Sequence, residues 1–471
     1  MKNYSPITHE IRQRIIDELG PEYVFQDTET VQSYDRDASE LRYLPELVVK
    51  VDRVDQIQRL LQLANQFRFP VTPRGGGSGL AGGCLAVHGG VVLSLENLNR
   101  IHSIDTKNLV AEVEPGVITQ ALRDAVRAKH LFYPPDPAGL DQSTIGGNAA
   151  TNAGGPACAK YGTTKDYILE LEAVLPNGEK IRTGTKTRKG VVGYDMTHLL
   201  IGSEGTLGII TGLTLKLIPH PTGVTGVAAV FENLDTAMRA VSAIMIRGHL
   251  PSAIEFLDSK CLKLVGDLLP FKVSGENSSL LFIETDGHAE HIHREIERIG
   301  NICREIGAVH ILPAPEAGDR ERIWDVRRQV SLRIHDNSAL YFPEDVVVPI
   351  ARIADLVNTL PEFEAEYGLY IYAFGHAGDG NIHLNITADS RDQIKRVEKG
   401  VTAILARVLE MGGTISGEHG IGAWKMDYLP MEIESESIRL QKGIKALFDP
   451  NMILNPGKLF KFNHHNLPPN I

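Results

Sequence analysis

Residues 70–83, Pro-Val-Thr-Pro-Arg-Gly-Gly-Gly-Ser-Gly-Leu-Ala-Gly-Gly, restrict the fold of this chain more than any other stretch. Glycines at this density disfavour a helix and bring no side chains to a core. They do expose backbone N–H groups that suit a diphosphate, while Arg74 and Ser78 add a positive charge and a hydroxyl donor. A single run of this kind is commonly a surface loop. Two more Gly-rich segments downstream favour a nucleotide-binding role instead.

Residues 77–82 also fit the G-x-G-x-x-G pattern of dinucleotide-binding Rossmann folds. That pattern requires a helix to open directly after the glycines. Here residues 82–90 run straight into a strand-like segment, 90–95, so no helix fits between them. We therefore interpret the match as accidental, and an NAD-dependent Rossmann dehydrogenase as the weaker alternative.

The composition is that of a large globular protein with no nucleic-acid function. The chain has 471 residues, 42% of them hydrophobic, which is enough for two or three domains. Its net charge of −11 argues against binding to nucleic acid. The four cysteines lie far apart without C-x-x-C spacing, which argues against an iron–sulfur cluster and suits a reducing cytoplasm. We expect no transmembrane segment and a cytoplasmic location, compatible with peripheral attachment at the inner face of a membrane.

The pattern of strands and helices predicts an α+β protein that changes character near Pro219 and Pro221. After this point, residues 223–410 are expected to form an antiparallel sheet with helices on one face. Helices are expected over residues 7–19, 118–129, 234–246, 288–306, 319–334, 401–411 and 440–448. A further helix, capped by Asp52 or Asp55 and ended by Pro70, is expected to carry Ile57, Leu60, Leu61 and Ala64 on its apolar face.

The two further Gly-rich segments are residues 134–162 and 202–211. The first contains two Gly-Gly pairs beside Asn148 and Asn152. Bare backbone and short polar side chains of this kind can line a wall against a flat ring and its phosphate tail. A nucleotide cofactor is therefore expected between these segments.

Residues 370–386 predict a β-hairpin with strands at 370–374 and 381–386 and a turn at Gly378-Asp379-Gly380. Strand alternation then lets His376 and His383 face each other across the hairpin. Two facing imidazoles are half of a metal site.

A third metal ligand is available in Glu418 of Ser416-Gly417-Glu418-His419-Gly420, and the adjacent His419 could act as a base. A lone histidine here would be structural, but the combination favours a divalent metal, zinc, iron or manganese. A metal hydrolase is the alternative, although it would leave the Gly-rich segments unexplained and the chain has no nucleophile elbow.

With these motifs, the chain resembles the VAO/PCMH-type FAD-linked oxidase/dehydrogenase family. It is similar to the branch with D-lactate dehydrogenase, the FAD subunit of glycolate oxidase and D-2-hydroxyglutarate dehydrogenase. The resemblance covers nearly the whole chain. It implies an α+β fold with a two-lobed PCMH-type FAD-binding domain in residues 1–220 and an antiparallel-sheet substrate (cap) domain in 221–412. A C-terminal helical segment, 413–471, would return to the flavin.

The resemblance also assigns residues to the pyrophosphate, the flavin side and the adenosine of FAD. The cofactor-binding residues that it implies are Arg74, Gly75, Gly76, Gly77, Ser78, Gly79, Asp136, Ser143, Gly146, Gly147, Asn148, Thr151, Tyr161, Gly162, Glu204, Ile209, Ile210 and Asn455. Relatives with covalent FAD often carry a histidine where Ser78 stands, so non-covalent FAD is expected.

The same resemblance places the metal ligands at His376, His383 and Glu418, and the catalytic base at His419. Arg327 falls on the residue that clamps the substrate carboxylate, with Arg328 as the neighbouring alternative. The further substrate contacts that it implies are Asn385 and Ser331. Relatives that handle a second carboxylate carry a lysine shortly before the aspartate that matches Asp345. This chain has none there, which disfavours a dicarboxylate substrate.

The function implied by the resemblance is FAD-dependent oxidation of a small D-2-hydroxy acid to the 2-keto acid, with D-lactate or glycolate as first candidates. A hydride would pass to flavin N5, with a metal and a histidine base assisting. The alternatives are a D-2-hydroxyglutarate dehydrogenase and a non-catalytic flavoprotein subunit of an electron-transfer complex. Expected acceptors are a quinone, a cytochrome, an electron-transfer flavoprotein or an iron–sulfur partner subunit, rather than NAD or oxygen. A homodimer is compatible with this.

Overall fold

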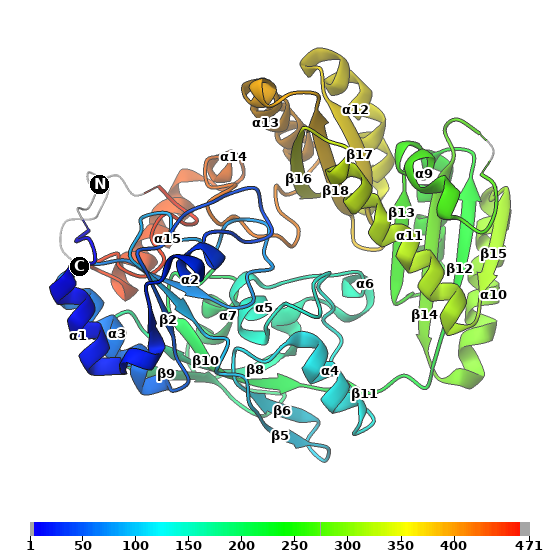
Figure 1. Ribbon diagram of the computed structural model, residues 1–471. Helices are drawn as coiled ribbons and strands as arrows, with labels where there is room; N and C mark the ends of the chain where they lie inside the picture. The colour runs from blue at the N-terminus through cyan, green and yellow to red at the C-terminus, as the bar shows by residue number, and fades with distance from the viewer. Residues whose placement is uncertain (1–3, 274, 462–471) are drawn as a thin grey trace. The chain divides into compact units, whose positions relative to one another are not determined.

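The computed structural model describes residues 4–273 and 275–461, and the chain divides into two compact units (Figure 1). The first unit consists of Met1–Gly154, Thr163–His220 and Glu418–Ile471. The second consists of Gly155–Gly162 and Pro221–Gly417. The last ten residues of the expected C-terminal segment, 462–471, lie outside the described residues.

The first unit contains two main sheets. In the smaller sheet, of order β1-β2-β4-β3, β4 pairs in parallel with both β2 and β3, while β1 is antiparallel to β2. The larger sheet is antiparallel, of order β5-β6-β10-β8-β9, and β7 and β11 form a separate pair. The strands are β1 (Val24–Phe25), β2 (Leu47–Lys50), β3 (Val71–Arg74), β4 (Val91–Ser94), β5 (Ile101–Asp105), β6 (Val110–Val113), β7 (Leu131–Phe132), β8 (Ile168–Val174), β9 (Lys180–Gly184), β10 (Ile209–Lys216) and β11 (Ile218–Pro219).

Amphipathic helices cover the smaller sheet. In α3, apolar residues recur every three or four positions, and Ile57, Leu60, Leu61 and Ala64 are fully buried. They share one core with α1 and strands β2, β3 and β4. The helices of this unit are α1 (His9–Leu19), α2 (Thr28–Ser33), α3 (Val54–Phe67), α4 (Thr119–Arg127), α5 (Ile145–Thr151), α7 (Met196–Leu200), α14 (Leu429–Glu432) and α15 (Ser435–Phe448).

Helix α5 lies in the second Gly-rich segment, for which the sequence predicted no helix. The Thr144 side chain accepts a hydrogen bond from the backbone N–H of Gly147, at 3.2 Å, and caps the helix. A Cβ at Gly146 would lie only 2.4 Å from the Cβ of Pro115. Gly146 is therefore required by the close packing of this helix against Pro115.

The second unit is built on one antiparallel sheet of order β15-β12-β14-β13-β17-β18-β16. Its strands are β12 (Gly223–Phe231), β13 (Ala253–Leu257), β14 (Ser279–Gly287), β15 (His310–Ala314), β16 (Leu340–Val347), β17 (Tyr370–His376) and β18 (Asn381–Ala388). Its helices are α6 (Cys158–Tyr161), α8 (Leu234–Ile246), α9 (Ser259–Val265), α10 (Ala289–Ile306), α11 (Ala317–Asp336), α12 (Ile353–Tyr367) and α13 (Ile394–Glu410).

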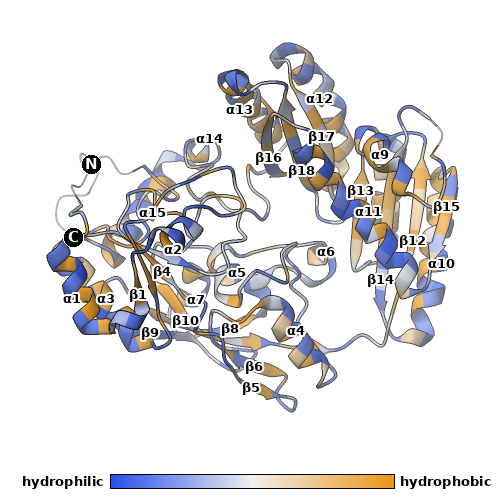
Figure 2. Ribbon diagram, viewed as in Figure 1, coloured by the Kyte–Doolittle hydropathy of each residue, from blue (hydrophilic) through white to orange (hydrophobic). Residues whose placement is uncertain are grey.

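Helices cover both faces of this sheet, so the prediction of helices on one face was wrong. Ala228 and Val230 of β12 share a core with α9 and α11. The alternate residues Ala229 and Phe231 are also fully buried, on the opposite face, and α8 and α10 pack on the same strand. Figure 2 shows hydrophobic colouring along β12 and β13, whereas α10 and α11 carry both hydrophobic and hydrophilic residues. A sheet that is apolar on both faces requires cover on both.

The C-terminal segment of the first unit is held by a buried lysine. The Lys445 Nζ donates to the Asp449 carboxylate at 2.6 Å and to the carbonyl oxygens of Thr206 and Leu454 at 2.7 and 2.8 Å. The same carboxylate accepts the backbone N–H groups of Ile453 and Leu454. The tail then pairs with β3 through Val71. No helix within residues 4–273 and 275–461 is both long and apolar enough to span a membrane.

We predict that Asp449→Asn destabilises the first unit by about 3 kcal/mol, because it leaves the Lys445 ammonium buried without its anion. Thermal unfolding followed by circular dichroism measures this. Glu436→Gln on the same helix is the control, because its partner Arg439 is exposed, and it should leave the unfolding temperature unchanged. Equal effects of the two substitutions would contradict the assigned role of Lys445.

Candidate active site

A cleft of about 1340 Å³, including the part open to solvent, lies within the first unit. Residues of the three Gly-rich segments line it, together with Glu418 and His419 of the C-terminal segment. All the predicted cofactor-binding residues line this cleft except Asp136, Tyr161, Gly162 and Asn455. The folded chain thus brings together segments up to about residue 210 with residues near 420.

Two glycines of the first segment serve different purposes. A Cβ on Gly76 would lie 2.0 Å from the carbonyl oxygen of Gln142, so packing within the protein requires glycine there. At Gly79, which lines the cleft, the Cβ position has no atom of the described chain within 4 Å. The Cβ position of Gly79 therefore faces open space in the cleft.

Arg74 lines the cleft but its guanidinium also has partners in the protein. Its Nη1 donates to the carbonyl oxygen of Arg36 at 2.8 Å, and its Cζ lies 5.1 Å from the ring centroid of Tyr34. Asp37, also in the lining, accepts the backbone N–H of Gly82 at 2.9 Å. Burial raises the pKa of Asp37, against the lowering effect of these hydrogen bonds and of Arg74. These contacts fix the position of one cation at the glycine loop.

Glu204 fixes the backbone that follows His419. Its carboxylate accepts the backbone N–H groups of Ile421 and Gly422 at 2.8 and 2.7 Å. Burial raises the pKa of Glu204, while the two N–H groups act to lower it. Glu204 was predicted to lie near the adenosine of the cofactor. The structure gives its carboxylate a role in positioning the cleft wall, and the predicted cofactor contact stays a prediction.

The predicted residues outside the cleft lining have other contacts. The Tyr161 hydroxyl donates to Asp286 at 2.8 Å, and both residues belong to the second unit, as does Gly162. The Asn455 side chain donates to the carbonyl oxygens of Gly83 and Glu204 at 2.9 and 2.7 Å, and so ties two cleft segments together. The cofactor roles of these residues stay predictions.

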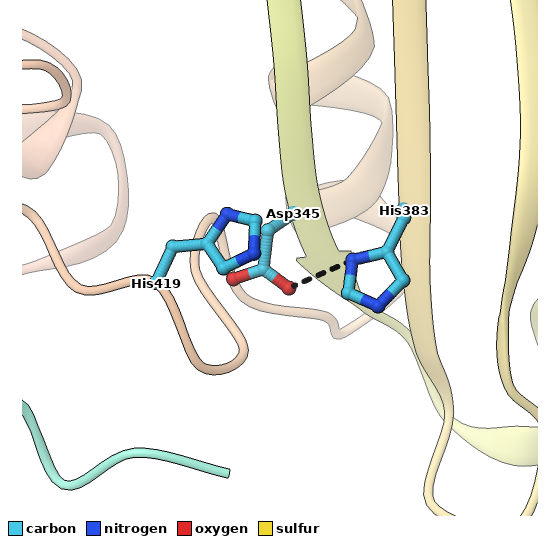
Figure 3. Close-up of side chains that lie close together, drawn as sticks. All are labelled: Asp345, His383 and His419. Carbon is cyan, nitrogen blue, oxygen red and sulfur yellow. Dashed lines mark ion pairs between the residues drawn. The ribbon is translucent and has the colours of Figure 1, made fainter. Parts of the chain in front are cut away.

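The second unit carries four polar side chains in a row across strands β13, β17, β18 and β16. The predicted facing of His376 and His383 is confirmed, since their Nε2 atoms lie 3.4 Å apart. On the far side of His376, Nδ1 contacts the Glu255 carboxylate, which is directly opposite it in the β13–β17 register. On the far side of His383, Nδ1 lies 4.0 Å from Asp345 Oδ1, its direct partner in β16 (Figure 3). Each imidazole therefore turns one nitrogen to a carboxylate and the other to its neighbour.

Arg327 of α11 lies beside this row. Its Nε donates to Glu255 Oε2 at 2.8 Å, and its Cζ lies 4.2 Å from the ring centroid of Phe374. Neither terminal nitrogen has a hydrogen-bond acceptor in the described chain. The side chain is 15% exposed, so a flat guanidinium is held with its two outer nitrogens available. Arg328, the alternative for the clamp, is instead paired with Glu321 and Asp325 at the surface.

The remaining predicted substrate contacts are near this region in the fold. Ser331 is one helical turn after Arg327 in α11, and Asn385 follows His383 on the same face of β18. The Asn385 side chain is buried, and its Nδ2 has no hydrogen-bond partner in the described chain. Such a buried donor needs a polar partner.

The comparisons with known proteins identify the family. Residues 45–184 match the family described as "FAD binding domain", and residues 221–459 match "FAD linked oxidases, C-terminal domain". The chain is 41% identical to the glycolate oxidase subunit GlcD of Bacillus subtilis (strain 168), over 96% of this chain and 97% of that one. The chain belongs to the FAD-linked oxidases. A D-lactate dehydrogenase of Anaerostipes hadrus is 36% identical, over 97% of this chain and 98% of that protein.

Solved structures show that this FAD-linked oxidase shares its fold with more distant proteins. A p-cresol methylhydroxylase structure aligns with a TM-score of 0.79 at 18% identity, covering 96% of each chain. The 4-ethylphenol oxidase of Gulosibacter chungangensis aligns with a TM-score of 0.77 at 21% identity, covering 97% of each. The predicted α+β fold class and the predicted FAD cofactor are confirmed. The open space at Gly79 in the oxidase's cleft fits such a cofactor.

The sequence did not lead us to Glu255, and it identified Asp345 only as the match of an aspartate in relatives, without a role in the site. The notable signal for each was a carboxylate within a buried, strand-like run. Asp345 is fully buried and accepts the Asn381 side-chain amide at 2.6 Å and the backbone N–H of Gly417 at 2.8 Å. Burial acts to raise the pKa of Glu255, but its interactions with His376 and Arg327 lower it overall.

We predict that Gly79→Val weakens FAD binding at least tenfold without destabilising the FAD-free protein, because the new side chain enters open cleft space. Titration of FAD-free protein with FAD, followed by flavin fluorescence, measures the affinity. Gly443→Val is the control, since its Cβ position is also open but lies outside the cleft lining. Unchanged FAD affinity in Gly79→Val would contradict a cofactor at this position.

Proposed function

We propose that this FAD-linked oxidase converts a small D-2-hydroxy acid, D-lactate or glycolate in the first instance, to the 2-keto acid. The observation that supports this most strongly is Arg327, a pre-positioned guanidinium, beside the paired imidazoles of His376 and His383. A 2-hydroxy acid presents a carboxylate and a hydroxyl on adjacent carbons, which this arrangement suits. The names of the relatives, glycolate oxidase subunit and D-lactate dehydrogenase, agree with it.

Arg327 would bind the substrate carboxylate through its two terminal nitrogens. Its Nε is occupied by Glu255 and its flat face by Phe374, so the direction of the fork is set before substrate arrives. Asn385, with its buried unpaired Nδ2, would donate to a substrate oxygen, and Ser331 would lie next to Arg327 on the same helix face. The sequence has no lysine in residues 341–344, shortly before Asp345, which favours a monocarboxylate substrate.

The paired histidines fit a divalent metal. Two imidazole nitrogens bound to one tetrahedral ion at the usual distance lie about 3.3 Å apart, and the observed separation is 3.4 Å. The carboxylates behind the rings are the partners that metal-binding histidines commonly have. We propose Glu418, the next residue after Gly417, as the third ligand. A metal held there would supply positive charge that lowers the pKa of a substrate hydroxyl.

His419 would take the hydroxyl proton on an imidazole nitrogen. It lines the cleft of the first unit, and Glu204 fixes the backbone two residues further on. FAD, when bound in that cleft, supplies the acceptor for the hydride from C2. The proton and the two electrons of the hydride thus leave the substrate by separate routes.

We propose that residues 1–220 and the segment 413–471 bind FAD, and that residues 221–412 bind the substrate. The reduced flavin would be reoxidised by a quinone, a cytochrome, an electron-transfer flavoprotein or an iron–sulfur partner. The cysteine spacing supports a protein of a reducing cytoplasm without an iron–sulfur cluster of its own.

Anaerobic mixing tests the function. We predict that D-lactate or glycolate bleaches the visible absorbance of the bound flavin, whereas L-lactate and D-2-hydroxyglutarate act far more slowly. Metal content is measured on the same sample by elemental analysis. Failure of all 2-hydroxy acids to bleach the flavin would contradict the proposal and favour a subunit that only relays electrons.

The His419→Ala variant separates the base from FAD binding. It should retain bound FAD and lose at least about 100-fold in the rate of bleaching, as expected for loss of a general base. His198→Ala, an exposed histidine of the same unit paired with Asp195, is the matched control.

A further inference from the structure

One carboxylate, that of Glu255, contacts both the proposed substrate clamp and one of the paired histidines. Its Oε2 accepts from the Arg327 Nε, and its Oε1 contacts the His376 Nδ1. The side chain is 2% exposed, so water does not compete for either oxygen. Glu255 therefore links the position of the Arg327 guanidinium to the orientation of the His376 ring.

The contact with Arg327 decides which way the Glu255 carboxylate faces. An arginine Nε–H is a donor in every protonation state found in proteins, so it always occupies one carboxylate oxygen. The remaining oxygen, Oε1, is an acceptor and faces the His376 Nδ1. An acceptor at Nδ1 requires a proton on that nitrogen, and in the neutral ring this leaves Nε2 with its lone pair.

A carboxylate also faces Nδ1 of the other imidazole, His383, but from a greater distance. His383 Nδ1 lies 4.0 Å from Asp345, whose oxygens are taken mainly by Asn381 and Gly417. His376 is thus the ring whose tautomer the protein determines more strongly.

The same helix and sheet contain a second arginine–glutamate pair, in which no histidine of the described chain contacts the glutamate. Arg320 lies two turns before Arg327 in α11, and its Nε is 3.5 Å from Glu284 Oε2. Glu284 of β14 is also contacted by the Trp324 indole at 3.3 Å. In both pairs, Arg320–Glu284 and Arg327–Glu255, an arginine of α11 meets a glutamate on the same face of the sheet. They differ in that a histidine completes only the second.

We propose that Glu255, held by Arg327, is a positioning residue that keeps the proton of His376 on Nδ1 and so leaves Nε2 able to bind a metal. This proposal rests on the proposed function, because it assumes that the paired Nε2 atoms are ligands. It makes α11 part of the metal site although this helix would contribute no ligand to it.

The Glu255→Gln substitution tests this with little change of shape. The amide oxygen must face the Arg327 Nε–H, which leaves the amide NH₂ to donate to the His376 Nδ1. The ring proton then moves to Nε2 and blocks the ligand. We predict at least a tenfold loss of Zn²⁺ affinity, the loss typical for partners of metal-bound histidines. Equilibrium dialysis of the FAD-loaded protein against buffered Zn²⁺, with elemental analysis, measures it.

Glu284→Gln is the matched control and should keep wild-type Zn²⁺ affinity. FAD content and unfolding temperature, measured on all samples, show whether each variant is folded. Equal Zn²⁺ affinity in wild type and Glu255→Gln would overturn the inference about Glu255. A wild-type protein that binds no Zn²⁺ would instead contradict the metal in the proposed function.

A measurement on the wild-type protein covers the case in which Glu255→Gln fails to fold. Long-range ¹H–¹⁵N spectra of metal-free protein with ¹⁵N-labelled histidine report which ring nitrogen carries a proton, and His376→Gln assigns the signal. We expect a proton on Nδ1 of His376. A ring with a bare Nδ1 would overturn the inference.

Discussion

The register of four antiparallel strands is the constraint on which the rest of the site depends. It sets Glu255 opposite His376 in one strand pair and Asp345 opposite His383 in another, with the two imidazoles adjoining between them. A shift by one residue in any of these strands would turn the side chain to the other face of the sheet. Arg327, from a helix that packs on this face, is then held by a carboxylate already in place. Polar groups in a buried row must all be satisfied together, which explains why each imidazole has a carboxylate behind it.

In the first unit, the main structural requirement is an open cleft. Its glycines bring three segments close together, as at Gly76, and keep one position, Gly79, open to the cleft. The last of the four points at which the chain passes from one unit to the other, between Gly417 and Glu418, has a backbone anchor on either side. Asp345 binds the backbone of Gly417 in the second unit, and Glu204 binds that of Ile421 in the first. The two residues proposed for metal ligation and proton transfer, Glu418 and His419, lie between these two anchors. Their backbone is therefore restrained by carboxylates from both units.

The sequence was sufficient for the features that local chemistry determines. Alternation and a Gly-Asp-Gly turn predicted the hairpin of β17 and β18, and with it the facing of His376 and His383. It was not sufficient for Glu255, because all five residues of β13 are buried and show no alternation, and its partner lies 121 residues away. Nor did it predict α5, whose glycines disfavour a helix. That helix depends on a threonine cap and on packing against a distant proline. Contacts between residues far apart in the sequence determine such positions, and the secondary-structure propensity of a local segment does not predict them.

The position of a bound metal ion shows whether the paired histidines form the proposed site. Crystals of the FAD-loaded protein, grown with the metal that elemental analysis finds in it, give anomalous difference maps at that metal's absorption edge. We predict one strong peak within bonding distance of the Nε2 atoms of both His376 and His383, with Glu418 as a further ligand. A strong peak elsewhere, with the two imidazoles in contact and no ion between them while FAD occupies its cleft, would contradict it.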